Sequence, residues 1–205
     1  MNKTVLLDCD YVILNINHAF NTFLQKTTSL DFGSEILSLP TFEWPYFKEN
    51  PSLLREYAKE FQLSDLFRQG IPMPGAVSAL KRLKQNGYSL HVLSSALADE
   101  NKKDKTTANR LKNLHFVFGH LFDDVHILPW AADKTDTLKC YPKNSYFVED
   151  SLRHALEALK IGHSPILLRS CFNEKFLQSH DVQNIPVFKT WDEITNFILD
   201  NQNVF

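Results

Sequence analysis

Two short apolar runs that lead directly into pairs of carboxylates constrain the fold of this chain more than any other feature. The first run lies near the N-terminus and leads into Asp8 and Asp10. The second, Tyr146–Val148, leads into Glu149 and Asp150. A short apolar run is typical of a buried parallel strand, and such sheets gather their functional side chains where the strands end. Asp8 and Asp10 are two residues apart, so in extended chain their side chains point the same way. The sequence therefore predicts an acidic site for a hard cation such as Mg²⁺.

Length, composition and charge agree with one globular domain that carries a modest insertion. The chain has 205 residues, of which 43% are hydrophobic and 22% charged, and its formal net charge is −2. This charge gives no electrostatic reason to expect a nucleic acid polymer or an anionic membrane as partner. The three cysteines lack metal-site spacing, and no run resembles a membrane span or a signal peptide. We therefore expect a reduced cytoplasmic protein, either a monomer or a homodimer.

From residue 72 onward, strand and helix patterns alternate along the chain. Alternation of this kind predicts an α/β fold in three layers, a Rossmann-like parallel sheet covered by helices on both faces. The helix over about 98–113 is polar, which indicates a solvated helix face. The expected helices cover 74–87, about 98–113, 152–160 and 191–199, and the expected strands cover 89–93, 125–128, 145–150, 165–169 and 187–188.

Residues 15–71 interrupt this alternation. They contain little strand pattern but two helical stretches, Ala19–Gln25 and Leu53–Phe61. An insertion directly after the first strand would form a small helical cap over the strand ends. The expected organisation is therefore a catalytic core of residues 1–14 and 72–205 with a cap of residues 15–71.

Four motifs follow one another at the ends of expected strands: Asp8-Cys9-Asp10-Tyr11-Val12-Ile13, Val92-Leu93-Ser94, Lys134, and Val148-Glu149-Asp150-Ser151. In this order they resemble the motifs of the haloacid dehalogenase-like hydrolase superfamily. One such motif would be weak evidence, whereas four in order are specific. The resemblance implies a Mg²⁺-dependent phosphatase that forms an aspartyl-phosphate on a small phosphorylated metabolite. Asp10 favours phosphoryl transfer, because family members that cleave carbon–halogen bonds need no acid or base at that position.

The resemblance also implies roles for the acidic residues. Asp8 would be the nucleophile, and Asp10 would protonate the leaving oxygen and then activate water. Asp8, the backbone carbonyl of Asp10 and Asp150 would hold Mg²⁺, which usually keeps several waters. Glu149 either binds the metal directly or lies outside its coordination sphere, in contact with the ligands.

Phosphate binding is assigned to hydroxyl and ammonium groups. Ser94 would bind phosphoryl oxygens together with backbone N–H groups, although Ser95 could take its place. Lys134 would neutralise the non-bridging charge. Lys139, further along the same helix, is the competing lysine, but it lies further from the strand end.

Substrate identity is less determined. Tyr11 stands where family members often have glycine, so its ring could narrow the site. Trp44 and Tyr46 could stack on a nucleobase, with packing inside the cap as the competing role. The C-terminal half resembles 5′(3′)-deoxyribonucleotidases, which makes a nucleoside monophosphate one candidate substrate. The Glu-Asp-Ser form of the last motif is instead similar to sugar-phosphate phosphatases and phosphomutases. The alternatives are a phosphomutase acting on a sugar phosphate and a non-enzymatic phosphate-binding regulatory module.

Overall fold

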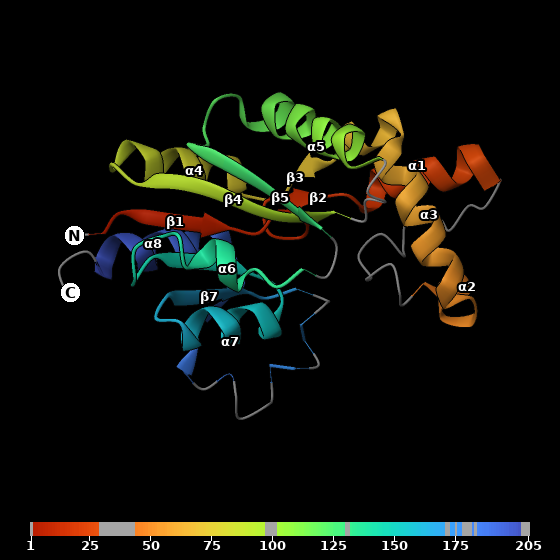
Figure 1. Cartoon of the computed structure of the whole chain (residues 1–205). Coiled ribbons are helices and arrows are strands. Elements are labelled where there is room, and N and C mark those ends of the chain that lie inside the picture. Colours follow the sequence, from red (N-terminus) through yellow and green to blue (C-terminus); the bar gives the residue numbers. More distant parts are fainter. Residues whose placement is uncertain are drawn as a thin grey trace.

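A six-stranded parallel sheet forms the centre of the molecule (Figure 1). The computed structural model describes residues 2–28, 44–96, 102–129, 132–170, 173–174, 176–177, 182 and 184–201. The strand order is β5-β4-β1-β6-β7-β8, and all five neighbouring pairs run parallel. The strands are β1 (Thr4–Leu7), β4 (Ser89–Ala96), β5 (Asp124–Pro129), β6 (Tyr146–Glu149), β7 (Ser164–Leu168) and β8 (Val187–Phe188).

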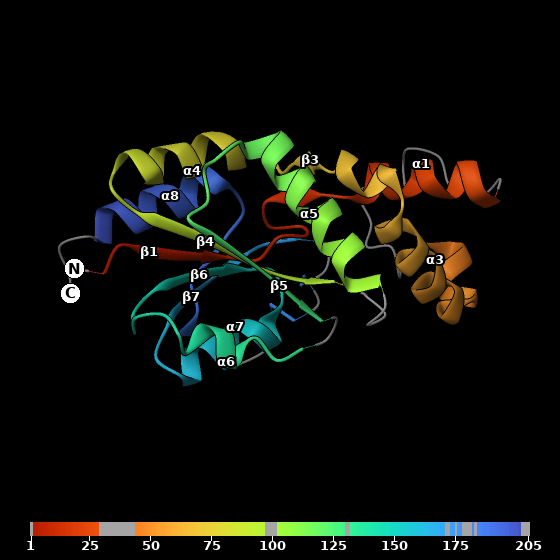
Figure 2. The ribbon, with the colours of Figure 1, turned by 45° about the horizontal axis from the view of Figure 1, so that its top comes forward.

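Helices cover both faces of this sheet, which confirms the expected three layers (Figure 2). On one face, α4 (Ala76–Gln85) and α8 (Trp191–Asp200) pack against the sheet through residues such as Leu80 and Ile194. On the other face, α6 (Thr135–Leu138) and α7 (Leu152–Lys160) contribute Leu138 and Ala158 to a second core. These amphipathic helices bury one stripe each, as their spacing predicts.

The alternation of side chains along β1 decides which groups meet at the site. Val5 and Leu7 belong to the core beneath α4 and α8, whereas Leu6 belongs to the core beneath α6 and α7. Asp8 is two residues beyond Leu6 and so shares its face. The backbone N–H of Asp8 donates to the carbonyl oxygen of Val148 at 2.9 Å, which holds the ends of β1 and β6 side by side.

The described residues between β2 (Leu14–Asn15) and β3 (Ile71–Pro72) form a group of helices beyond the carboxyl ends of the strands (Figure 1). The chain leaves and returns through these two strands, which form a small antiparallel pair. The sequence from residue 39 to 47 is rich in proline and aromatic residues, and positions 39–43 of it lie outside the described residues. The helices are α1 (Asn17–Thr28), α2 (Pro45–Glu49), α3 (Pro51–Leu63) and the 3₁₀ helix η3 (Asp65–Gln69).

The polar helix α5 (Lys103–Phe118) differs from the solvated face that we expected. Its first turn is exposed, but Asn109 and Asn113 are buried against the end of α3, η3 and the residues that flank η3. The Asn109 amide donates to the backbone carbonyls of Gln62 and Ser64 at 3.0 and 3.2 Å. Polar side chains are buried here because they satisfy backbone carbonyls that would otherwise lack partners.

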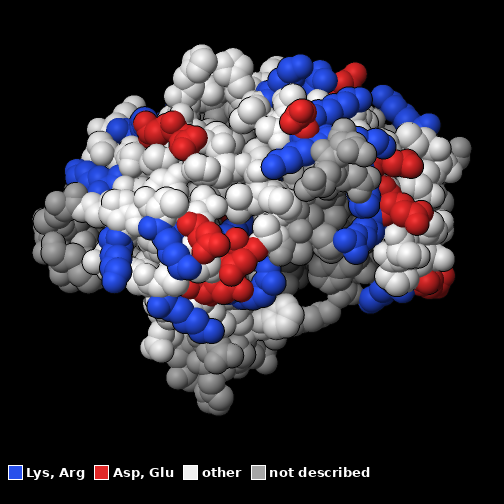
Figure 3. Space-filling model, viewed as in Figure 1, with Lys and Arg blue, Asp and Glu red and all other residues white. Residues whose placement is uncertain are grey.

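In the view of Figure 3, a group of acidic side chains lies near the middle of the face with basic side chains around it. Lysine and arginine are interspersed with aspartate and glutamate over the described part of that face, in keeping with the net charge of −2. Within the described residues, no helix has the length and apolar character needed to cross a membrane.

Candidate active site

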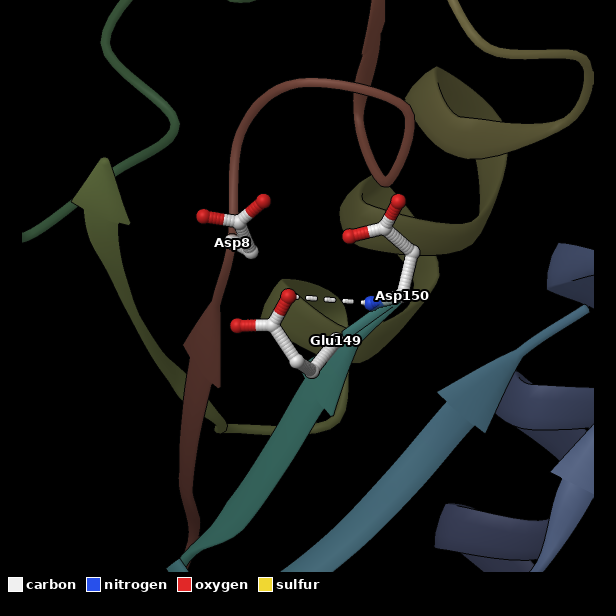
Figure 4. A group of neighbouring side chains, drawn as sticks. All are labelled: Asp8, Glu149 and Asp150. Atoms are coloured by element: carbon white, nitrogen blue, oxygen red, sulfur yellow. Dashed lines mark hydrogen bonds between the residues drawn. The ribbon is translucent and has the colours of Figure 1, made fainter. Parts of the chain in front are cut away.

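Three carboxylates from two adjacent strands meet at the carboxyl edge of the sheet (Figure 4). Asp8 follows β1, while Glu149 ends β6 and Asp150 follows it. One oxygen from each lies within 4.8 Å of the others. Glu149 Oε1 accepts hydrogen bonds from the backbone N–H groups of Asp150 and Ser151, both at 3.1 Å. The structure therefore brings together the acidic residues that the strand ends predicted.

Lys134 lies between these carboxylates at the start of α6. Its Nζ is 2.5 Å from Asp8 Oδ1 and 2.8 Å from Glu149 Oε2. The residue is only 2% exposed, so both ion pairs are largely shielded from water. The competing lysine, Lys139, is exposed on the surface and pairs with Asp136. The geometry thus favours Lys134 as the cation of the site.

One ammonium group does not balance three crowded carboxylates. Burial and the neighbouring Glu149 raise the pKa of Asp8 to about 7 even though Lys134 opposes the shift. Burial, Glu149 and Asp8 raise the pKa of Asp150 well above its ordinary value. Burial would also raise the pKa of Glu149, but Lys134 outweighs it and lowers that pKa. Three ionised carboxylates would therefore carry more negative charge than Lys134 compensates, and their all-oxygen donor set suits a hard divalent cation.

Both oxygens of Glu149 already have partners, which bears on its role. Oε1 accepts the two backbone N–H groups and Oε2 the ammonium of Lys134. The carboxylate is 1% exposed. These contacts favour the alternative in which Glu149 does not bind the metal itself but holds Lys134 and the turn after β6 in place.

Asp10 stands apart from this cluster and has its own cationic partner. Its Oδ2 accepts a hydrogen bond from Arg110 Nη2 at 2.6 Å, and the Arg110 side chain is fully buried. Sequence reasoning missed Arg110, because no motif includes it. The available signal was the recurrence of Thr106, Asn109, Arg110 and Asn113 at spacings of three or four, which places them on one helix face.

The two candidate serines lie on opposite faces of β4. Leu93 packs in the core beneath α6 and α7, so Ser95 lies on the side of Asp8. Ser94 lies on the other face of the strand, which belongs to the core that contains Cys9. Ser95 Oγ is buried and has no hydrogen-bond partner within the described structure. The register therefore favours Ser95, the alternative, over Ser94.

The proposed substrate-contacting aromatics differ in their positions. Trp44 is fully buried, with its ring centroid 6.1 Å from that of Phe47 and 5.9 Å from that of Phe20. It thus packs inside the helical insertion and presents no surface for stacking, contrary to that expectation. Tyr46 packs edge-on against Phe47 and is half-buried.

Tyr11 has a left-handed backbone, with φ 63°, where glycine is the residue of least strain. Its hydroxyl group is 2.8 Å from Asn17 Oδ1 and donates to it. This contact links the loop after Asp10 to the first helix of the insertion.

Asn173 supports the turn after β6 from behind. This buried amide donates to the backbone carbonyls of Asp150 and Leu168 at 2.9 and 2.8 Å. Its oxygen accepts the N–H of Ser170 at 3.0 Å. Asn173 therefore ties the backbone of an acidic residue to the end of β7, and sequence reasoning did not identify it.

No protein-family model and no curated protein sequence matches this chain. Solved structures do match over nearly its whole length. A predicted phosphatase from Clostridium acetobutylicum has 17% identity and a TM-score of 0.65, covering 98% of this chain and 99% of its own. D,D-heptose 1,7-bisphosphate phosphatase from B. bronchiseptica, complexed with magnesium and phosphate, has 15% identity and a TM-score of 0.56, with coverages of 97% and 99%. A haloacid dehalogenase-like family hydrolase from Streptococcus pneumoniae has 14% identity and a TM-score of 0.59, with coverages of 96% and 98%. The chain therefore has the fold of haloacid dehalogenase-like hydrolases.

Proposed function

We propose that this protein is a divalent-cation-dependent phosphatase that hydrolyses the phosphomonoester of a small metabolite through an aspartyl-phosphate on Asp8. One observation carries the proposal. Asp8, at the end of the central strand, contacts Lys134 and lies within 4.8 Å of the two β6 carboxylates, in a fold shared with phosphatases. A carboxylate, a fixed ammonium and a set of oxygen donors are the groups that phosphoryl transfer to a carboxylate requires.

The cation would be Mg²⁺, held by Asp8, Asp150 and the backbone carbonyl of Asp10. When bound, it supplies positive charge that screens the repulsion between Asp8 and an anionic phosphoryl group. The residues present fit this role, because the buried carboxylates leave negative charge that Lys134 alone does not compensate. Glu149 would orient Lys134 from behind.

The chain's own residues would divide the remaining work. Asp8 attacks phosphorus, and the bond between phosphorus and the leaving oxygen breaks while Asp10 gives that oxygen a proton. Water then attacks the aspartyl-phosphate, gives its proton to Asp10 and releases phosphate from Asp8. Lys134 and Ser95 would contact the non-bridging oxygens, with Ser94 as the weaker candidate.

Residues 15–71 would act as the cap over this site. Their described helices are joined to the core by the two-stranded β2–β3 link and lie beyond the strand ends. Because Trp44 is enclosed in the cap's aromatic core, base stacking on it no longer supports a nucleotide substrate. Tyr11 and Tyr46 remain the candidate specificity residues, and a nucleoside monophosphate remains one substrate to test.

Hydrolysis of an aryl phosphate by the purified protein tests the proposal. We expect turnover with Mg²⁺, reversible loss on chelation, and loss of nearly all turnover in Asp8→Asn. Lys139→Met, which changes an exposed lysine of the same helix, is the control and should stay active. Turnover without divalent metal, or an active Asp8→Asn protein, would overturn the mechanism. A panel of nucleotides and sugar phosphates would then define the substrate.

A further inference from the structure

Arg110 is a fully buried arginine that connects a core carboxylate to the cap. Its Nη2 donates to Asp10 Oδ2 at 2.6 Å. On its other side, the centre of the guanidinium lies 4.3 Å from the ring centroid of Phe67, a residue of η3. Phe67 is itself fully buried within the cap's aromatic cluster. One side chain of α5 therefore contacts both the loop after β1 and the cap.

The contact between Arg110 and Asp10 uses only one oxygen of the carboxylate. An arginine fork can bind both oxygens of a carboxylate in parallel. Here Asp10 Oδ1 is buried without a hydrogen-bond partner in the described structure, and so are Nε and Nη1 of Arg110. The geometry thus fixes Oδ2 and leaves Oδ1 available, an arrangement suited to a carboxylate that transfers protons through one oxygen.

Neighbouring side chains of α5 keep Arg110 in register with the cap. One turn further along, the Asn113 amide donates to the backbone carbonyls of Arg68 and Gly70 at 2.8 and 3.0 Å. Arg68 Nε in turn donates to Asn109 Oδ1 at 2.8 Å. These bonds connect the same helix to the same cap segment without touching Asp10. They therefore provide matched controls for the contact of Arg110.

We propose that Arg110 is a positioning residue of the reaction: it holds Asp10 Oδ2 so that Oδ1 faces the reacting oxygens, and it does so while Phe67 of the cap is seated on it. This inference rests on the proposed phosphatase function. In the first step Oδ1 gives its proton to the leaving oxygen as the phosphorus–oxygen bond breaks. In the second step Oδ1 takes a proton from water as the new phosphorus–oxygen bond forms and Asp8 departs.

The role of Arg110 separates the two steps when the leaving group is good. A phenolate with a low pKa departs without help, whereas water still requires a base. Arg110→Ala should therefore release a first equivalent of phenolate in a rapid burst and then turn over slowly. A misplaced catalytic group costs about 100-fold in rate. On such an aryl phosphate we therefore expect kcat to fall by about that factor, and KM to fall with it because the aspartyl-phosphate accumulates.

The experiment compares Arg110→Ala, Arg110→Lys and Asn113→Ala with the unaltered protein, on an aryl phosphate and an alkyl phosphate. Arg110→Ala should lose kcat/KM on the alkyl phosphate, whose leaving oxygen needs the proton, and keep most of its kcat/KM on the aryl phosphate. Guanidinium chloride at a non-denaturing concentration should raise kcat of Arg110→Ala only. Arg110→Lys should retain intermediate activity, because it keeps the charge but not the planar fork. Asn113→Ala should show neither rescue nor leaving-group dependence.

Two outcomes would overturn the inference while the proposed function stands. One is an Arg110→Ala protein whose kcat falls no more than that of Asn113→Ala. The other is an equal proportional loss of kcat/KM on the aryl and the alkyl phosphate, with no rescue by guanidinium. If Arg110→Ala does not fold, a full-activity Arg110→Lys protein would likewise exclude a fork-specific role. Absence of turnover in the unaltered protein would instead overturn the proposed function itself.

Discussion

Replacement of Lys134 by methionine should destabilise the protein far more than any exposed lysine substitution. Methionine keeps most of the apolar stem but removes the ammonium that contacts Asp8 and Glu149 at 2.5 and 2.8 Å. The side chains of these partners are only 13% and 1% exposed. Removal of one member of a buried ion pair costs about 3–5 kcal/mol, because the remaining charge stays buried without compensation. We expect a loss of this size in the free energy of unfolding at neutral pH.

The loss in the free energy of unfolding caused by Lys134→Met should grow as the pH rises. Burial and Glu149 already raise the pKa of Asp8 in the folded protein to about 7, so the folded state binds the proton more tightly than the unfolded state. Stability from such a group is complete below the unfolded pKa and is lost as the pH rises through the folded pKa. Lys134 opposes this shift and lowers the pKa of Glu149. Removal of the Lys134 ammonium raises the pKa of both Asp8 and Glu149. The loss in the free energy of unfolding should therefore be smaller at pH 5 than at pH 8.

Urea unfolding in chelator at pH 5 and pH 8 measures this difference. Lys139→Met is the control, because Lys139 pairs with Asp136 on the surface and such pairs are worth about 0.2–1 kcal/mol. Mg²⁺ should restore part of the stability of Lys134→Met at pH 8, since a cation can compensate the same carboxylates. If Lys134→Met and Lys139→Met lose equal stability at both pH values, the charge balance described for the site is wrong.

Three further predictions concern groups around the site. Ser95→Ala should weaken inhibition by inorganic phosphate about tenfold or more, as expected for a lost hydrogen bond to a charged group, and Ser94→Ala should weaken it less; the reverse order would return the role to Ser94. Tyr11→Gly should exceed Tyr11→Ala in free energy of unfolding by about 1 kcal/mol, because φ is 63° at this position; thermal or urea unfolding in which alanine is the more stable would contradict this. Asn173→Ala should raise the Mg²⁺ concentration needed for half-maximal activity by about 10- to 100-fold, the usual effect of losing an outer support of a metal ligand; an unchanged Mg²⁺ titration would show that Asp150 needs no such support.

The sequence predicted best those helices and strands whose own pattern of apolar residues determines which side is buried. The helix expected over 152–160 and the strand over 187–188 match α7 and β8 at both ends. An amphipathic stripe or a short apolar run buries itself against any apolar surface, so local pattern is sufficient. The strand ending in Ser94 and Ser95 is longer than expected, since β4 continues to Ala96.

Helix α5 shows where local pattern fails. Polar residues usually indicate solvent, yet Asn109, Arg110 and Asn113 are buried. Their partners are backbone carbonyls of α3 and of the residues around η3, together with the carboxylate of Asp10, about 40 to 100 positions away in sequence. Sequence pattern does not show which distant groups will satisfy a polar side chain, so these residues could be placed only by the fold.

The acidic residues were predictable for a different reason. Parallel strands end at one edge, so carboxylates at two strand ends must meet wherever the two strands are neighbours. The choice between Ser94 and Ser95 required more, because strand alternation assigns a face only once the register with β1 is known. Leu7 pairs with Val92 in that register, and from this pairing Ser95 lies on the side of Asp8.

In the proposed mechanism, the two cations of the site, Lys134 and Arg110, have separate tasks for a physical reason. Lys134 compensates part of the charge on Asp8 and Glu149, so its balance changes whenever a divalent cation or an anionic substrate arrives. Arg110 contacts Asp10 alone among the acidic residues described at the site and packs against the cap through Phe67. A guanidinium stays protonated in this setting, since the neighbouring Asp10 raises its pKa despite burial. In this mechanism, movement of the cap would change the position of Asp10 through Arg110. Binding of the cation and the phosphate would instead change the charge balance around Asp8.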